Sequence, residues 1–167
     1  MRIIAAFCCF LLMLAQPALA ATSPAMQSFE QQLRALIKSQ SGDYGVAALD
    51  LKTGELISVR GDEPFPMAST VKIAVAANYL AQVEHGRRSL DDRIGGRSAR
   101  SLIEAMMIDS DNRATDILMR DLGGPATLHE WLTQQGVTGI RIDRKIAQLL
   151  RSPRDLWDVK DSSTPKA

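Results

Sequence analysis

Residues 65–72 read Phe65-Pro66-Met67-Ala68-Ser69-Thr70-Val71-Lys72, and this octapeptide leads into a predicted helix over residues 69–83. Ser69 and Lys72 lie almost one helical turn apart, so their side chains share a face of that helix. Burial of a lysine beside a serine lowers the lysine pKa, and the neutral amine can then take the serine proton. The first turn of a helix also leaves backbone N–H groups free to bind an oxyanion. The pattern therefore predicts a serine nucleophile at the start of a helix.

A second polar motif, Ser110-Asp111-Asn112, separates two further predicted helices over residues 99–107 and 113–122. We expect Ser110 to relay a proton and Asn112 to donate its side-chain amide to a substrate carbonyl. Asp111 is expected to hold the turn by accepting backbone N–H groups. A simple N-terminal helix cap is the alternative interpretation of these three residues. A second Ser-x-x-Lys match over residues 163–166 has no predicted core after it, and we interpret it as chance.

The hydrophobic pattern predicts a mixed α and β architecture around the two motifs. We expect a helix over residues 25–40, a β-hairpin over 44–60, a connector over 86–96 and a further helix over 125–135. Lys52-Thr53-Gly54 forms the predicted hairpin turn, with the glycine taking a positive φ. Met106 and Met107 are both predicted to fill the core. From Gly139 onward the pattern predicts a long, charged and irregular stretch.

Five segments together resemble the class A serine β-lactamases: residues 45–50, 65–72, 110–112, 122–125 and 138–144. The resemblance extends over about residues 25–165. It implies an α+β fold, a β-lactamase-like sandwich in which an all-helical half packs on an antiparallel sheet. It also implies that a β-lactam acylates Ser69 and that Lys72 is the acylation base. Ser110 would protonate the leaving nitrogen, and Asn112 would hold the substrate side-chain amide.

The third motif of this family, Lys-Thr-Gly, is not found on a strand downstream of the serine. The copy at Lys52-Thr53-Gly54 precedes Ser69 and lies in the predicted hairpin turn. We therefore expect residues 21–167 to be the N-terminal two thirds of a catalytic domain, with the C-terminal strands and helix missing. Because only one hairpin is predicted, we also expect marginal stability.

The sequence also departs from the family in the loop that carries its deacylating glutamate. Ile146 occupies the position of that glutamate, and an isoleucine cannot activate water, so we expect impaired deacylation. Asp155 or Asp158 is the alternative base. Arg144 and Asp161 match the pair that bridges the base of this loop in the family. The connector at 86–96 is short and lacks the aromatic residue that the family usually places at the pocket rim.

Three functions remain open from these residues. The first is a β-lactam hydrolase that acts through Ser69 on a small-molecule β-lactam. The second is a penicillin-binding or D-Ala-D-Ala peptidase-like protein, which would share the acylation groups and lack the glutamate. The third is a β-lactam binder without turnover, or a decayed fragment.

The first twenty residues predict a secretory signal peptide, and therefore a periplasmic or secreted protein. Arg2 precedes an uncharged apolar run, and Ala18-Leu19-Ala20 is a small-x-small cleavage site. The run is shorter than the ~20 apolar residues that span a bilayer, so we expect no stable membrane anchor. Cys8 and Cys9 lie within this segment. The predicted mature chain therefore contains no cysteine.

The charge balance indicates no nucleic-acid partner. The chain has 20 basic and 19 acidic residues, and removal of Arg2 leaves 19 of each. His85 and His129 are far apart and neither has a second ligand at metal spacing, so we interpret both as surface residues. We expect no metal, no cofactor and a monomer.

Overall fold

The computed structural model describes residues 22–151 and 161–167, without the side chains of residues 149–151 and 161. The predicted signal peptide and both candidate bases, Asp155 and Asp158, lie outside the described residues. The Asp161 side chain, on which the predicted pairing with Arg144 depends, also lies outside the described part of the structure.

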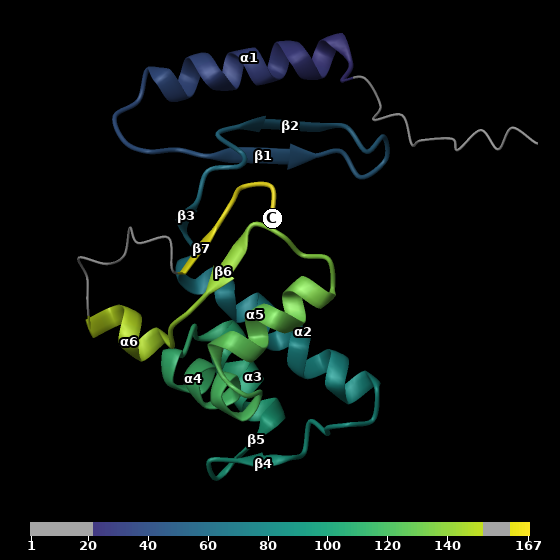
Figure 1. The fold of residues 1–167 in the computed structure, drawn as a ribbon, viewed down its shortest axis with the longest axis vertical. Helices are drawn as coiled ribbons and strands as arrows, with labels where there is room; N and C mark the ends of the chain where they lie inside the picture. The colour runs from purple at the N-terminus through teal and green to yellow at the C-terminus, as the bar shows by residue number, and fades with distance from the viewer. Residues whose placement is uncertain (1–21, 152–160) are drawn as a thin grey trace, which may run out of the picture.

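The N-terminal part consists of a helix beside a two-stranded hairpin (Figure 1), as predicted. The helix is α1 (Pro24–Lys38), and the antiparallel strands are β1 (Val46–Leu49) and β2 (Leu56–Val59). Ser23 caps α1 by accepting the Met26 N–H. Gly54 closes the hairpin turn at a φ of 73°, a value that glycine adopts without strain. The family-like triplet Lys52-Thr53-Gly54 is therefore a turn, as its sequence context predicts.

A second sheet joins segments that are far apart in the sequence. Its antiparallel order is β3 (Phe65–Pro66), β7 (Asp161–Ser163) and β6 (Ile140–Ile142). Phe65 pairs with Ser163, and Ile140 pairs with the same serine from the other side. The prediction of an irregular chain from Gly139 onward is therefore wrong. Each strand has only two or three residues, which is too short for an alternating pattern to be recognised.

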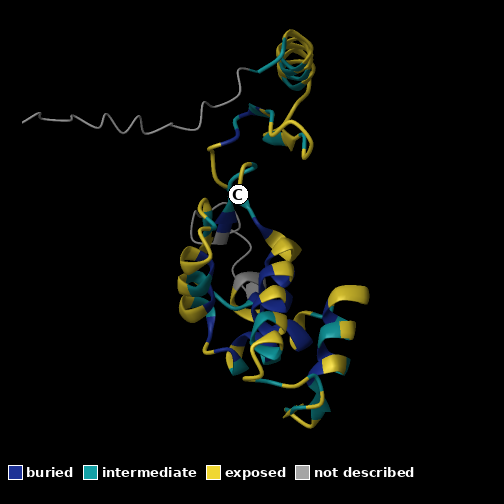
Figure 2. Ribbon diagram, turned by 90° about the vertical axis from the view of Figure 1, so that its right-hand side faces the viewer, coloured by how far each residue is buried: buried dark blue, intermediate teal, exposed yellow. Residues whose placement is uncertain are grey.

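The helical half of the molecule contains most of the core (Figure 2). Its elements are the 3-10 turn η1 (Ala68–Thr70), α2 (Val71–Glu84), the two-stranded ribbon β4 (Arg93–Ile94) and β5 (Arg97–Ser98), α3 (Ala99–Ile108), α4 (Asn112–Asp121), α5 (Pro125–Gln134) and α6 (Ile146–Arg151). Val75, Tyr79, Leu102, Leu118 and Leu128 are completely buried among them. The predicted helices at 69–83, 99–107, 113–122 and 125–135 are confirmed within one or two residues at each end. The α+β class is likewise confirmed.

Two predictions about single side chains in this half are wrong. Met106 is buried as expected, but Met107 is 48% exposed, because successive residues of a helix point about 100° apart. His129 is half-buried, and its Nδ1 atom is shielded from solvent with no hydrogen-bond partner among the described residues. It is therefore not a simple surface histidine, whereas His85 is exposed.

The N-terminal part leaves much apolar surface uncovered. No residue of α1 is buried, and the exposed side chains include Phe29, Leu36, Leu49 and Leu56. No helix within the described ranges is long and apolar enough to span a membrane.

Candidate active site

The nucleophile candidate lies where β3 turns into α2. Ser69 is in the middle of η1, and Lys72 is the second residue of α2. Ala68 has a positive φ of 46°, an uncommon conformation for a residue with a side chain. Ser69 therefore lies in the 3-10 turn that leads directly into α2, and its own N–H donates to no other described residue. This N–H is therefore free to face a negatively charged oxygen.

The opposite wall of the site is the turn between α3 and α4. Ser110 adopts a φ of 55°, and such backbone conformations cost about 1–3 kcal/mol and cluster at functional sites. Asp111 caps α4, because its Oδ1 accepts the N–H groups of Arg113 and Ala114 at 2.7 and 3.1 Å. The bond from Ala114 is the main reason that the pKa of Asp111 lies below its usual value. Asp111 thus holds the turn, as expected, while Ser110 and Asn112 project beside it.

Lys72 joins the two walls. Its Nζ atom lies 3.3 Å from Ser69 Oγ, 2.6 Å from Ser110 Oγ, 2.7 Å from the Ser110 carbonyl and 2.8 Å from Asn112 Oδ1. The two serine hydroxyl oxygens are 3.4 Å apart. The structure therefore brings all four predicted site residues, Ser69, Lys72, Ser110 and Asn112, into one hydrogen-bonded cluster.

The environment of Lys72 favours its neutral form more than water does. The side chain is only 3% exposed. This burial lowers the pKa of the Lys72 ammonium, and the nearby Asp111 carboxylate partly opposes the shift. A neutral amine has two N–H donors, which match the Ser110 carbonyl and Asn112 Oδ1, and a lone pair that can accept a serine proton. The cluster therefore suits a proton transfer between the two serines through Lys72.

Ile146, which the sequence resemblance matches to the family glutamate, adds no polar group near this cluster. Ile146 is 7% exposed and belongs to the hydrophobic core. Its segment is fixed by Asp116, which was not singled out in the sequence. Asp116 accepts the N–H groups of Ile146 and Ala147 at 2.8 and 3.0 Å. Asp116 thereby caps α6 from α4.

The second Ser-x-x-Lys match does not form a comparable pair. The Ser163 hydroxyl donates to the Thr164 carbonyl at 3.1 Å. Lys166 forms a salt bridge with Asp62 at 2.7 Å. The two side chains therefore bind different partners.

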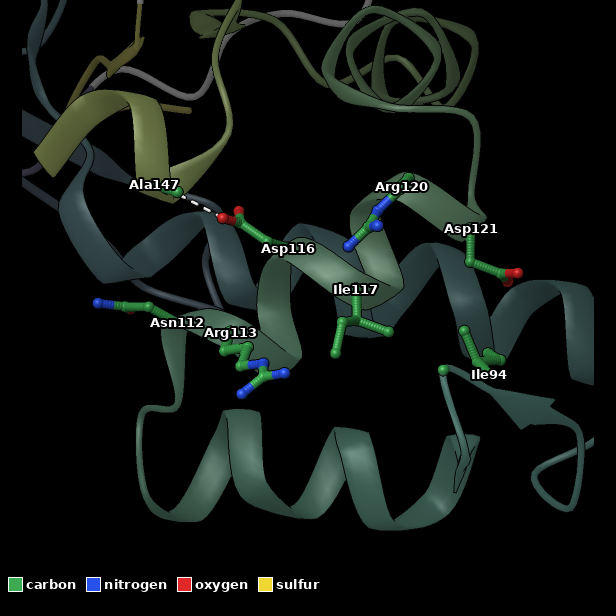
Figure 3. A pocket seen from close by; sticks show the side chains of 9 residues that line it. Ile94, Asn112, Arg113, Asp116, Ile117, Arg120, Asp121 and Ala147 are labelled. Carbon is green, nitrogen blue, oxygen red and sulfur yellow. Dashed lines mark hydrogen bonds between the residues drawn. The ribbon is translucent and has the colours of Figure 1, made fainter. Parts of the chain in front are cut away.

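A cavity of about 680 Å³ lies beside Asn112, along α4 (Figure 3). Its lining residues come from α4, from the β4–β5 ribbon and from the start of α6, namely Ile94, Gly95, Asn112, Arg113, Asp116, Ile117, Arg120, Asp121 and Ala147. The spacing of Arg113, Ile117 and Arg120 on one helix face was the signal in the sequence that could have indicated this surface. Within residues 22–151 and 161–167, no three metal-ligating side chains converge.

Comparison with known proteins assigns the chain to a family. A family model described as "Beta-lactamase enzyme family" matches residues 28–167. The β-lactamase PSE-4 of Pseudomonas aeruginosa is 31% identical over 166 residues, which cover 88% of this chain and 57% of that protein. The β-lactamase L2 of Stenotrophomonas maltophilia is 34% identical over 152 residues, covering 80% of this chain and 50% of L2.

Solved structures agree with this assignment. The ancestral class A β-lactamase GNCA aligns with a TM-score of 0.73 and 36% identity, over 82% of this chain and 59% of that structure. The chain therefore belongs to the β-lactamase enzyme family, and its fold is that of the class A enzymes, as the resemblance implied. It spans a little over half the length of the relatives that it matches.

Proposed function

We propose that the protein is a class A-type serine hydrolase that opens β-lactams through an acyl-enzyme at Ser69. The observation that carries this proposal is the cluster in which buried Lys72 contacts Ser69, Ser110 and Asn112. Family membership supports the substrate class, because the matched relatives are β-lactamases.

In this mechanism neutral Lys72 accepts the proton of Ser69 while Ser69 Oγ attacks the β-lactam carbonyl carbon. The carbonyl oxygen becomes an oxyanion and accepts the Ser69 N–H. Lys72 passes its proton to Ser110, whose hydroxyl oxygen lies 2.6 Å from Nζ. Ser110 then protonates the ring nitrogen as the carbon–nitrogen bond breaks. Asn112 donates its amide N–H to the carbonyl of the substrate side chain, since its Oδ1 is already bound to Lys72.

Release of the acyl group is proposed to be slow. General-base catalysis typically contributes about 10²–10⁴-fold, and Ile146 cannot supply it. The burial of Ile146 also favours a second candidate function. This function is that of a D-Ala-D-Ala peptidase-like protein or of a β-lactam binding protein without turnover.

We further propose that residues 1–20 are a signal peptide and that residues 21–167 belong to a catalytic domain in the periplasm or outside the cell. The ligand in this proposal is a small-molecule β-lactam bound by a monomer. The proposal includes no nucleic-acid partner and no stable membrane anchor.

The test is covalent labelling by benzylpenicillin, followed by peptide mapping. We expect one equivalent of adduct on Ser69 and none in Ser69→Ala. Ser163→Ala is the matched control, since it removes the serine of the second Ser-x-x-Lys match, and it should label fully. An adduct on Ser110 or Ser163 would refute the choice of nucleophile. Release of hydrolysed penicillin would identify a hydrolase. Cleavage of a D-Ala-D-Ala peptide would identify a peptidase, and an adduct that persists without release would identify a binding protein.

A further inference from the structure

A second, smaller cavity of about 190 Å³ lies between α2 and α5, two helices that pack against each other. Its walls include Asn78 and Gln82 of α2 and Glu130, Trp131 and Gln134 of α5. Glu130 and Gln134 are exposed, so the cavity can be reached from the surface. Pockets for drug-sized ligands measure about 300–1,000 Å³, and this cavity is therefore sized for one small ring.

The cavity contains an asparagine that is buried and only partly hydrogen-bonded. Asn78 is 2% exposed, and its Oδ1 accepts an N–H of Gln82 at 2.7 Å. Its Nδ2 donates to no residue in the described ranges. The side-chain atoms of these ranges that are both fully shielded from solvent and unpaired include His129 Nδ1 but not Asn78 Nδ2. Because a buried donor without a partner is destabilising, the N–H groups of Asn78 are available to a ligand in the cavity.

Neighbouring hydrogen bonds fix which end of the Asn78 amide is left unpaired. Arg88 Nε can only donate, so it bonds to Gln82 Oε1, at 2.9 Å. Gln82 therefore presents its N–H groups to Asn78, and the oxygen of Asn78 must accept. Arg88 is held in turn by a salt bridge with Asp121 and by a bond to the Asp121 carbonyl at 2.9 Å. This chain of contacts orients the N–H donors of Asn78 before any ligand binds.

The α5 side of the cavity adds acceptors and an apolar surface. Glu130 Oε1 lies 3.4 Å from Gln134 Nε2, which leaves the Gln134 carbonyl oxygen available as an acceptor. Trp131 is half-buried and packs on the core, so it offers one rigid face. Glu130 is the only ionisable side chain among the described residues that line the cavity, and its charge disfavours an anion. A cation, by contrast, has no acceptor for the N–H groups of Asn78. The lining therefore favours a neutral ligand that both donates and accepts.

We propose that the cavity between α2 and α5 binds one neutral sugar ring. A hydroxyl group both donates and accepts, so one hydroxyl accepts from Asn78 while its neighbours donate to Glu130 and Gln134. The apolar C–H face of a pyranose packs on the Trp131 indole and on Leu122, which lines the same cavity. None of these residues belongs to the candidate active site, so the proposal goes beyond the function proposed above and does not depend on it.

NMR titration of the full chain with methyl β-D-glucopyranoside tests the site. We expect saturable binding with a dissociation constant of about 1 mM, which is what an ordinary ligand efficiency gives a molecule of this size. The side-chain amide signals of Asn78 and the indole N–H signal of Trp131 should shift with the same midpoint. 2-Methoxytetrahydropyran, a similar ring without hydroxyl groups, should bind at least about tenfold more weakly.

Two exposed residues at the rim can be replaced without disturbing the core. Glu130→Ala/Gln134→Ala should weaken binding of the glucoside at least about fivefold. Glu84→Ala/Gln135→Ala is the matched control, because both residues are exposed near the ends of the same helices and neither lines the cavity. It should bind as the wild type does.

Asn78→Asp is a second variant, with nearly the same side-chain shape. It keeps an oxygen for Gln82 and removes both N–H donors, so binding should be lost. The rim variant keeps the test decisive if Asn78→Asp does not fold.

Saturable shifts at Asn78 and Trp131 that are reduced in the rim variant and kept in the control support the site. No saturable shift at concentrations far above the expected dissociation constant overturns it. Equal affinity for the ring without hydroxyls, or unchanged affinity in the rim variant, also overturns it. Tighter binding of the anionic methyl β-D-glucuronide would contradict the choice of a neutral sugar.

Discussion

Replacing Asp116 with alanine should release the start of α6 from α4. The carboxylate accepts two backbone N–H groups, at 2.8 and 3.0 Å, from residues that otherwise begin a helix without a cap. A hydrogen bond to a charged group contributes about 1.5–3 kcal/mol, and loss of a helix cap costs about 0.5–2 kcal/mol. Because Asp116 is only half-buried, we take a value of about 2 kcal/mol for the two bonds together.

This free energy corresponds to about a 30-fold change in the local opening equilibrium. Amide hydrogen exchange at Ile146 and Ala147 measures that opening directly. Asp116→Ala should accelerate exchange at both amides about 30-fold. Asp116→Asn should have a smaller effect, because its amide has only one acceptor oxygen.

Asp109→Ala is the matched control for this experiment. Asp109 is an exposed residue at the end of α3 with no side-chain hydrogen bond to any described residue. Its replacement should leave exchange at Ile146 and Ala147 unchanged. If Asp116→Ala also leaves both amides as protected as in the wild type, the carboxylate does not hold α6 and the reasoning fails.

The remaining predictions concern turnover, stability and export. Ile146→Glu should shorten the lifetime of the acyl-enzyme by up to about 10²-fold. The gain should grow with pH because burial raises the pKa of a carboxyl at this position, and an unchanged decay of the adduct in mass spectrometry would contradict it. Leu102→Ala removes a fully buried side chain and should lower the free energy of unfolding in urea by about 2–5 kcal/mol. Leu51→Ala, at a residue that is 89% exposed, should change it by less than about 0.5 kcal/mol, and equal losses would refute the assignment of the core. Exported protein should begin at Ala21, and its mass should show that Met1 has been removed.

The helices were predictable from the sequence because each has strong local signals. Asp111 caps α4 with its side chain, and Pro125 begins α5 after a glycine. The hairpin was predictable because its strands flank a turn that contains Gly54. The four candidate site residues could be named from the sequence because two motifs in this order are specific in combination, although each alone is weak, and the structure places them in one cluster.

The β3–β7–β6 sheet and the cavity depend on contacts that no local pattern records. Phe65 pairs with Ser163 across almost a hundred residues, and two or three residues carry no periodicity. The capping role of Asp116 was not predictable, because the N–H groups that it accepts belong to α6, 30 and 31 residues further along the chain. Met107 was misassigned because hydrophobic character does not fix which face of a helix a residue occupies.

The pH dependence of Ser69 acylation tests the central claim most directly. If Lys72 must be neutral to accept the proton, the second-order rate constant for benzylpenicillin should rise with pH. Because burial lowers the pKa of Lys72, the midpoint of that rise should lie below the usual lysine value. Lys72→Arg, which stays charged, should label far more slowly at every pH. A rate that does not vary with pH, or that is equal in Lys72→Arg, would contradict the account.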